Sequence, residues 1–194
     1  MYLSQWRLNR PKTSAGGYFN PYDLHKILWK TFPGRPEAKR DFLFRVDKIG
    51  KDFSVLLLSA VEPAAAEDLI QLRETAQLDL KLETGAVYRF ALRANPVKRL
   101  SKERDRVPLV GDEELSAWLK RKFAGAAEIL ESAAGKRMDI DFLKAGRWGK
   151  ITAVDFDGCL RCEDGEALRS LLTGGIGAAK AFGCGLLLLQ RANA

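Results

Sequence analysis

The chain has 194 residues, of which 46% are hydrophobic and 29% charged, a composition typical of one ordinary globular domain or two small ones. Its apolar runs are far shorter than the roughly 20 residues of a membrane helix, and its first residues lack the pattern of a signal peptide. Three cysteines are too few for a disulfide scaffold and suit a reducing compartment, so we expect a cytoplasmic protein.

The formal net charge of +7 is concentrated in two blocks of the sequence. Residues 1–51 carry eleven Lys/Arg against four Asp/Glu, and residues 89–106 carry seven against two. Basic blocks that are distant in sequence are typical of an anion-binding surface that forms on folding. Ordinary solvated lysine is the alternative, and it has more weight for residues 35–51 than for 89–106, where arginines interrupt an apolar segment.

In chain order, residues 2–9 alternate apolar and polar side chains and predict a half-buried strand. Asn20-Pro21 is a strong helix start, and Pro33-Gly34 ends this helix after about Phe32. The elements expected next are strands at 42–46 and 53–60 around a turn at 50–52, a short helix at 64–69, and strands at 78–82 and 87–92. This order suggests a ferredoxin-like unit with an extra edge strand.

Residues 98–106 are charged and poor in apolar side chains, and we interpret them as a linker. The second half repeats the strand and helix theme more loosely. Its expected elements are a helix at 112–131, strands at 138–143 and 150–161, a short helix at 166–172, a glycine-rich loop and a strand at 186–190. The predicted class is therefore α+β.

The single histidine, His25, lies on the helix predicted at 21–32. At roughly 100° per residue, Leu24, Ile27, Leu28 and Thr31 share one face of this helix. The other face carries Tyr22, His25, Lys26 and Trp29, with Lys30 at the border. A lone histidine is more often structural than catalytic. Its place off the apolar face, one turn from a tyrosine and among lysines, makes the two interpretations about equal.

Cleavage of RNA needs a group that deprotonates the 2′-hydroxyl, a group that protonates the leaving 5′-oxygen, and positive charge for the phosphorane. Histidine serves as acid or base near neutral pH, tyrosine donates or accepts a hydrogen bond, and lysine supplies fixed charge. Tyr22, His25 and Lys30 are of the right chemical types for these three tasks.

Several ordered motifs resemble the CasE-type CRISPR RNA endoribonucleases, the repeat-processing subunit of the Cascade complex. The similar segments are the start MYLS, the helix YDLHKILWK (22–30), RDFLFR (40–45), FALRANPVK (90–98), RVPL (106–109) and GGIGAAKAFGCGLL (174–187). Together they extend over nearly the whole chain.

This resemblance implies two tandem ferredoxin-like (RRM-like) domains, at residues 1–97 with the catalytic helix and 107–194 with the glycine-rich loop. It implies metal-independent cleavage of a CRISPR repeat stem-loop by 2′-hydroxyl attack, with a 2′,3′-cyclic phosphate as product and no cofactor. The family's active-site tyrosine, histidine and supporting lysine fall on Tyr22, His25 and Lys30. The implied partners are the repeat RNA and the other protein subunits of a Cascade-type complex.

RNA-binding residues are expected in two further segments and on the catalytic helix itself. Glycines let backbone amides approach a phosphate closely, although a tight turn is the alternative explanation of the glycine-rich loop. Arginine and lysine near a strand end contact phosphates without reading bases. The assigned residues are Lys26, Arg93, Asn95, Lys98, Arg99, Gly175, Gly177, Lys180 and Gly183. Around a probable hairpin, contact with an RNA stem and solvated charge are equally plausible for Lys136, Arg137, Lys144, Arg147 and Lys150.

Two other motifs have ordinary explanations. Cys159 and Cys162 form a lone Cys-x-x-Cys, and a zinc site would need His25 and Cys184, both distant in sequence. Residues 154–158 (VDFDG) mimic a phosphatase motif, but too little chain follows for that fold, and an Asp-Gly turn between strands explains them better. The main rival to an endoribonuclease is a non-catalytic RNA-binding scaffold subunit, with a phosphatase a distant third.

Overall fold

The computed structural model of the chain describes residues 1–8, 21–33, 41–49, 52–65, 70–99, 106–144 and 146–192. The predicted cap at Asn20, the Gly50-Lys51 turn, residues 66–69 of the predicted short helix and most of the 98–106 linker lie outside these ranges. None of the helices in the described ranges is long and apolar enough to cross a membrane.

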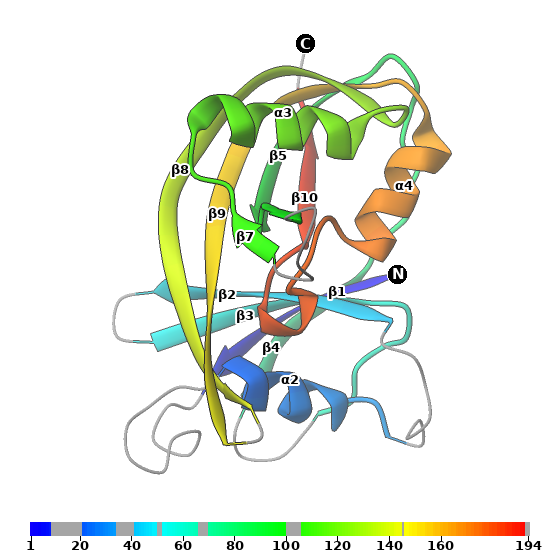
Figure 1. Cartoon of the computed structure of the whole chain (residues 1–194). Coiled ribbons are helices and arrows are strands. Elements are labelled where there is room, and N and C mark those ends of the chain that lie inside the picture. Colours follow the sequence, from blue (N-terminus) through cyan, green and yellow to red (C-terminus); the bar gives the residue numbers. More distant parts are fainter. Residues whose placement is uncertain are drawn as a thin grey trace.

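The first four strands form one antiparallel sheet in the order β2-β3-β1-β4, with helix α2 (Pro21–Trp29) on one face (Figure 1). The strands are β1 (Tyr2–Leu8), β2 (Phe42–Ile49), β3 (Asp52–Ser59) and β4 (Ile70–Gln77). Leu24 and Leu28 of the helix are buried with Trp6 and Phe44 of the sheet, as helical periodicity requires. The predicted strands at 2–9, 42–46 and 53–60 and the helix at 21–32 are confirmed, the last helical turn being a tightened turn that ends at Phe32.

The other four long strands form a second antiparallel sheet in the order β10-β5-β9-β8. They are β5 (Val87–Ala94), β8 (Ala127–Lys144), β9 (Arg147–Cys162) and β10 (Leu187–Arg191). Helices α3 (Asp112–Phe123) and α4 (Gly165–Gly174) bury Trp118, Phe123 and Leu168 against this sheet. A short ribbon of β6 (Val97–Arg99) and β7 (Arg106–Pro108) precedes α3, and a single 3-10 turn, η1 (Lys180–Phe182), precedes β10.

The two sheets have the same strand order. In each unit the first and third strands in sequence (β1 and β3, or β5 and β9) are central, and the second and fourth (β2 and β4, or β8 and β10) are at the edges. In each unit a helix follows the first strand and packs on one face of the sheet, which is the ferredoxin-like arrangement. The predicted fold class, α+β with two tandem ferredoxin-like units, is confirmed.

The individual elements of the two units differ from prediction in several places. Residues 78–82 keep alternating exposure but have no strand partner, and the fourth strand is β4. Residues 64–65 are not helical. The sequence places the strand at 87–92 in the first domain, but it forms β5, which pairs with β9 and β10 of the second sheet. This pairing favours a domain boundary between β4 and β5 over one at the linker. The helix predicted at 112–131 ends at Phe123, because Gly125 has a φ of 78° and β8 begins at Ala127.

The predicted Asp-Gly turn at 157–158 is wrong, because both residues lie inside the 16-residue strand β9. A Cβ on Gly158 would collide with the Glu131 carbonyl oxygen, at a place where the register between β8 and β9 shifts. The glycine therefore permits a β-bulge and does not reverse the chain. Cys159 and Cys162 of the same strand are three positions apart, so they point to opposite faces of the sheet.

The two sheets meet through a small apolar cluster and one buried ion-pair group. Leu43 and Leu58 of the first sheet pack against Leu186, next to β10. Beside them Arg93 of β5 donates to both carboxylate oxygens of Asp155 at 2.7 and 2.8 Å, to Asp47 of β2 at 3.1 Å and to the Val46 carbonyl oxygen at 2.6 Å. One side chain thus joins strands of both units.

The β8–β9 hairpin extends well beyond the second sheet. Strand β5 pairs with β9 only over residues 154–161, so residues 138–153 form a two-stranded arm (called the arm below) with no third strand among the described residues. Figure 1 shows the arm passing the edge of the first sheet and ending beside α2. The geometry brings the far end of the second unit to the helix that carries His25.

Candidate functional site

The side chains of Tyr22 and His25 lie next to each other on α2. Their ring centroids are 6.4 Å apart with an interplanar angle of 23°, as one helical turn of separation allows. Both residues are partly buried. The imidazole also lies 5.6 Å from the Phe42 ring and 6.4 Å from each of Phe44 and Trp29. His25 therefore sits at the margin of an aromatic layer, more enclosed than the helical wheel indicates, because the large rings of the edge strand β2 extend the core outward.

The two lysines of the helix lie on its exposed side. The Lys26 ammonium is 4.8 Å above the Tyr22 ring and 3.1 Å from an Asp23 carboxylate oxygen. Lys30 follows the last residue of α2, in the tightened turn where its amide donates to the Ile27 carbonyl oxygen. The structure thus brings Tyr22, His25 and Lys26 together and leaves Lys30 exposed at the end of the same helix. An imidazole beside a phenol, with ammonium groups at the border, can move protons and hold a phosphate.

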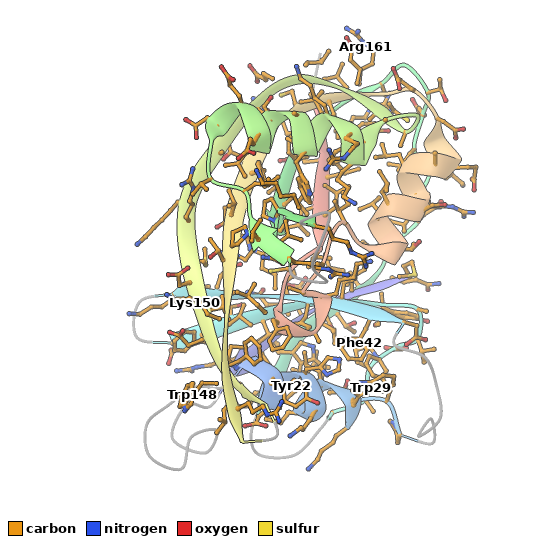
Figure 2. The ribbon with its side chains drawn as sticks, viewed as in Figure 1. Tyr22, Trp29, Phe42, Trp148, Lys150 and Arg161 are labelled. Atoms are coloured by element: carbon orange, nitrogen blue, oxygen red, sulfur yellow. The ribbon has the colours of Figure 1, made fainter. Side chains whose placement is uncertain are left out.

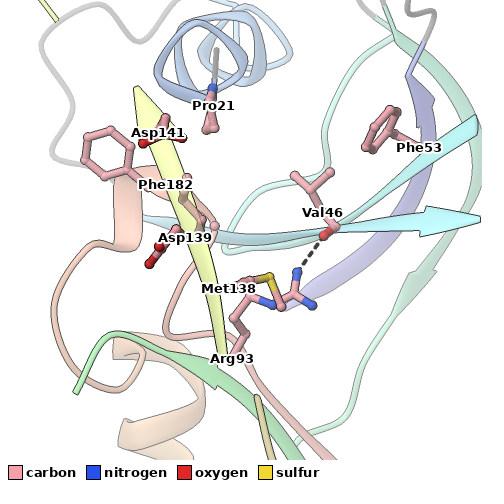
Figure 3. A pocket seen from close by; sticks show the side chains of 10 residues that line it. Pro21, Val46, Phe53, Arg93, Met138, Asp139, Asp141 and Phe182 are labelled. Carbon is pink, nitrogen blue, oxygen red and sulfur yellow. Dashed lines mark hydrogen bonds between the residues drawn. The ribbon is translucent and has the colours of Figure 1, made fainter. Parts of the chain in front are cut away.

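A pocket of about 270 Å³ opens beside this helix, between its first residue and the arm (Figure 3). Pro21, Val46, Met138 and Phe182 give it an apolar wall, and Gly183 lies at its edge. Arg93 and the carboxylates of Asp139 and Asp141 also line it. Because the Arg93 guanidinium is already bonded to Asp155 and Asp47, the two further carboxylates make the pocket unfavourable for a phosphate group.

A second, larger pocket of about 460 Å³ gathers several of the predicted RNA-binding residues. Its described lining contains four cations and no carboxylate, and it is bounded by β6, β7, α3 and the glycine-rich loop. The residues are Asn95, Val97, Arg99, Arg106, Trp118, Lys122, Gly175, Gly177, Ala178 and Lys180. We call it the basic pocket. Of the assigned residues, Asn95, Arg99, Gly175, Gly177 and Lys180 meet here.

The basic pocket contains an unfavourable charge pair. Arg99 and Arg106 are directly opposite each other in the β6–β7 ribbon. Like charges at opposite positions destabilise a strand pair unless an anion lies between them. Their juxtaposition therefore marks a place where a phosphate would be stabilising.

Sequence reasoning missed Arg106, Trp118 and Lys122 as members of this pocket. The Lys122 ammonium lies 5.8 Å from the Trp118 ring, on consecutive turns of α3. A four-residue spacing between a tryptophan and a lysine on one helix is visible in the sequence. Their proximity to the glycine-rich loop depends on tertiary packing and is not visible in the sequence.

The remaining assigned residues lie elsewhere. Arg93 is only 8% exposed, and its guanidinium is bonded to Asp155, Asp47 and Val46. Burial opposes its charge, but the hydrogen bond and charge of Asp155, with Asp47, raise its pKa above the ordinary value. Arg93 thus joins the two sheets through these bonds, and its assignment to RNA binding stays a prediction.

Other assigned residues are partly engaged within the protein. The buried Asn95 amide donates to the Thr152 carbonyl oxygen at 2.8 Å, so it also supports the wall of the basic pocket. Lys98 is exposed and pairs with Glu114 at 2.7 Å. Gly183 lies outside the basic pocket, where its missing side chain lets the loop pack close to Phe44.

The tip of the arm is basic and exposes a tryptophan. Trp148 is 66% exposed, and Figure 2 shows it at the level of α2, which carries Tyr22. Arg147 is exposed beside it, whereas Lys150 pairs with Asp139 at 2.8 Å and Arg137 donates to the Val110 carbonyl oxygen. Lys136 is exposed at the base of the arm, and the side chain of Lys144 lies outside the described part of the chain.

Comparison with known proteins identifies the class to which this fold and site belong. A family model described as CRISPR associated protein matches residues 1–191, and the chain belongs to that family. It is 40% identical over 181 residues to the CRISPR system Cascade subunit CasE of Escherichia coli strain K12, with 87% of this chain and 90% of that protein covered.

Two further comparisons indicate which type of CRISPR-associated protein the chain is. The chain is 32% identical over 207 residues to the CRISPR-associated endoribonuclease Cse3 of Thermus thermophilus, with 96% of this chain and 98% of that protein covered. A solved structure of CRISPR endoribonuclease Cse3 bound to a 19-nt RNA superposes with a TM-score of 0.87 at 29% identity, covering 98% of this chain and 100% of that one. The chain is thus a CasE-type member of the family.

Proposed function

We propose that the protein is a metal-independent endoribonuclease that cleaves CRISPR repeat RNA by attack of a 2′-hydroxyl, leaving a 2′,3′-cyclic phosphate. The observation that carries the proposal is the stacked Tyr22–His25 pair at the partly buried face of α2, with Lys26 and Lys30 on its exposed side. The relative named endoribonuclease Cse3 and the relative named Cascade subunit CasE support it.

The reaction follows from the chemistry of these side chains. The 2′-oxygen bonds to the phosphorus as the bond to the 5′-oxygen breaks, so the 2′-hydroxyl loses one proton and the 5′-oxygen gains one. His25 carries out one of these two transfers and solvent the other, because an imidazole exchanges protons near neutral pH. Tyr22 provides a hydroxyl one helical turn away, for a hydrogen bond to the phosphate or the nucleophile. Lys30, with Lys26 nearby, balances the charge that builds on the phosphorane. The protein's own side chains thus provide a proton-transfer group, a hydrogen bond and the balancing charge.

The RNA backbone is held mainly at the basic pocket. Arg99, Arg106, Lys122 and Lys180 neutralise phosphates, and the glycine-rich loop brings backbone amides close to them. Arg147 at the tip of the arm adds contact with the RNA stem near α2. The cleaved RNA remains bound, and the protein acts in the cytoplasm with the other subunits of a Cascade-type complex.

The decisive experiment incubates the purified protein with its cognate repeat RNA in excess EDTA, beside the same RNA with 2′-deoxyribose at the scissile nucleotide. We expect one cut in EDTA, blocked by the 2′-deoxy substitution and absent in His25→Ala, whereas Tyr22→Phe cuts more slowly. His25→Ala should bind the RNA with unchanged affinity and keep its melting temperature.

Other outcomes would separate the alternatives. Tight binding by the wild type without a cut would identify a non-catalytic scaffold subunit. Cleavage only after Mg²⁺ is restored, or full activity of His25→Ala, would mean that the active-site assignment is wrong.

A further inference from the structure

A series of aromatic contacts joins the arm to the proposed catalytic pair. The Phe182 ring of η1 lies 4.4 Å from the Phe142 ring of β8 and 6.0 Å from the Tyr22 ring. Tyr22 in turn stacks on His25. Three segments distant in sequence, namely α2, the arm and the glycine-rich loop, therefore meet ring against ring at the site.

The arm depends on such contacts for its position. An isolated two-stranded hairpin is marginally stable in water, and residues 138–153 have no third strand. The residue paired with Phe142 is Gly149, and a Cβ there would collide with the Phe142 ring. The glycine thus leaves space in which the ring can lie across the arm on the side that faces Phe182.

Neither Phe142 nor Phe182 is part of the buried cores. Both rings are only partly buried, and neither belongs to any of the three buried clusters formed by the described residues. Their packing is therefore not what stabilises either sheet. Instead, Phe182 contacts Tyr22, and Phe142 contacts Phe182.

We infer that Phe182 and Phe142 are positioning residues that fix the orientation of Tyr22 and couple it to the docking of the arm. This inference rests on the proposed function, and it names groups that do not touch the reacting atoms. Phe182 limits rotation of the Tyr22 ring, and Phe142 holds Phe182 when the arm is in place. RNA that binds the arm thereby stabilises the orientation of Tyr22 in which its hydroxyl acts.

The test is single-turnover cleavage under saturating protein, together with binding of the 2′-deoxy RNA. We expect Phe182→Leu to lower the cleavage rate about tenfold, because small misplacement of a reacting group is costly, while the Kd stays within about twofold. Phe182→Tyr, which keeps the ring, should restore the rate. Phe142→Leu and Gly149→Ala should each give a smaller loss of the same kind.

A double-mutant cycle shows whether Phe182 acts through Tyr22. In a Tyr22→Phe background, Phe182→Leu should cause little further loss of rate, because both changes remove the same contribution. The matched control is Phe123→Leu, which removes a ring pair with Phe90 at 5.8 Å in the second core. It should lower the melting temperature and leave the cleavage rate unchanged.

A second measurement does not require cleavage. In protein with ¹³C-labelled tyrosine, the Tyr22 ring signals, assigned by their loss in Tyr22→Phe, should shift in Phe142→Leu as well as in Phe182→Leu. Unmoved Tyr22 signals, a wild-type rate in Phe182→Leu, or multiplying losses in the cycle would each overturn the inference. Failure of the wild type to cut, with Tyr22 signals that do respond, would instead overturn the proposed function and leave the ring contacts established.

Discussion

The guanidinium of Arg93 lies between the two sheets, where Asp155, Asp47 and the Val46 carbonyl oxygen accept its hydrogen bonds. We expect Arg93→Ala to lower the free energy of unfolding by about 3 kcal/mol, because the partly buried Asp155 carboxylate loses its two short hydrogen bonds and keeps only the ion pair with Arg45 at 3.7 Å. Urea unfolding measures this loss. Arg89 lies on the same strand and is exposed. Arg89→Ala should therefore change stability by less than about 0.5 kcal/mol. Similar losses for the two variants would contradict a bridging role of Arg93.

Burial raises the pKa of the Cys184 thiol from its ordinary value of 9.0 to about 12. A thiol whose pKa is raised by folding stabilises the protein fully below pH 9, and this contribution disappears between pH 9 and 12. Wild-type protein should therefore lose about 2 kcal/mol more than Cys184→Ala on going from pH 8 to pH 10.5. Urea unfolding at the two pH values gives the difference, and parallel losses would show that the thiol ionises freely.

At the scale of elements, the two glycines at the end of α4 provide a matched pair. Gly175 has a φ of 74°, and a Cβ there would meet the Leu43 side chain at 2.6 Å, whereas Gly174 has open space around it. Gly175→Ala should cost about 1–3 kcal/mol and weaken RNA binding, because the glycine-rich loop must move. Gly174→Ala should be neutral or slightly stabilising. Thermal unfolding and RNA titration of both variants check this.

The sequence predicts helices and strands well where the local sequence pattern determines them, and poorly where pairing between distant strands determines them. Helix α2 follows from its proline start and its apolar spacing, and Tyr22 and His25 follow from one turn of helix. Residues 78–82 alternate as strictly as any strand, but they pair with none of the strands in the described part of the chain, because pairing depends on tertiary structure. The bonds of Arg93 could not be predicted from the sequence for the same reason, because its partner Asp155 is 62 residues away.

For the whole molecule, the net charge of +7 makes RNA affinity depend on salt. Arg106→Ala should weaken RNA binding at every sequence and lower the slope of log K against log salt by about one, because one phosphate contact is lost. Arg169→Ala, on α4 and paired with Glu166, should leave the slope unchanged. Filter binding from low to high salt measures both, and equal slopes for Arg106→Ala and wild type would remove Arg106 from the RNA surface.

The place of β10 in the second sheet has a consequence for biosynthesis. The first sheet and α2 are complete once Gln77 has left the ribosome, and they can fold while translation continues. One edge of strand β5 stays unpaired until β10 (Leu187–Arg191) is made, about one hundred residues later. Phe182 is made only shortly before that strand. A nascent chain therefore carries Tyr22 and His25 early but completes their surroundings only when residues 182–191 have been made.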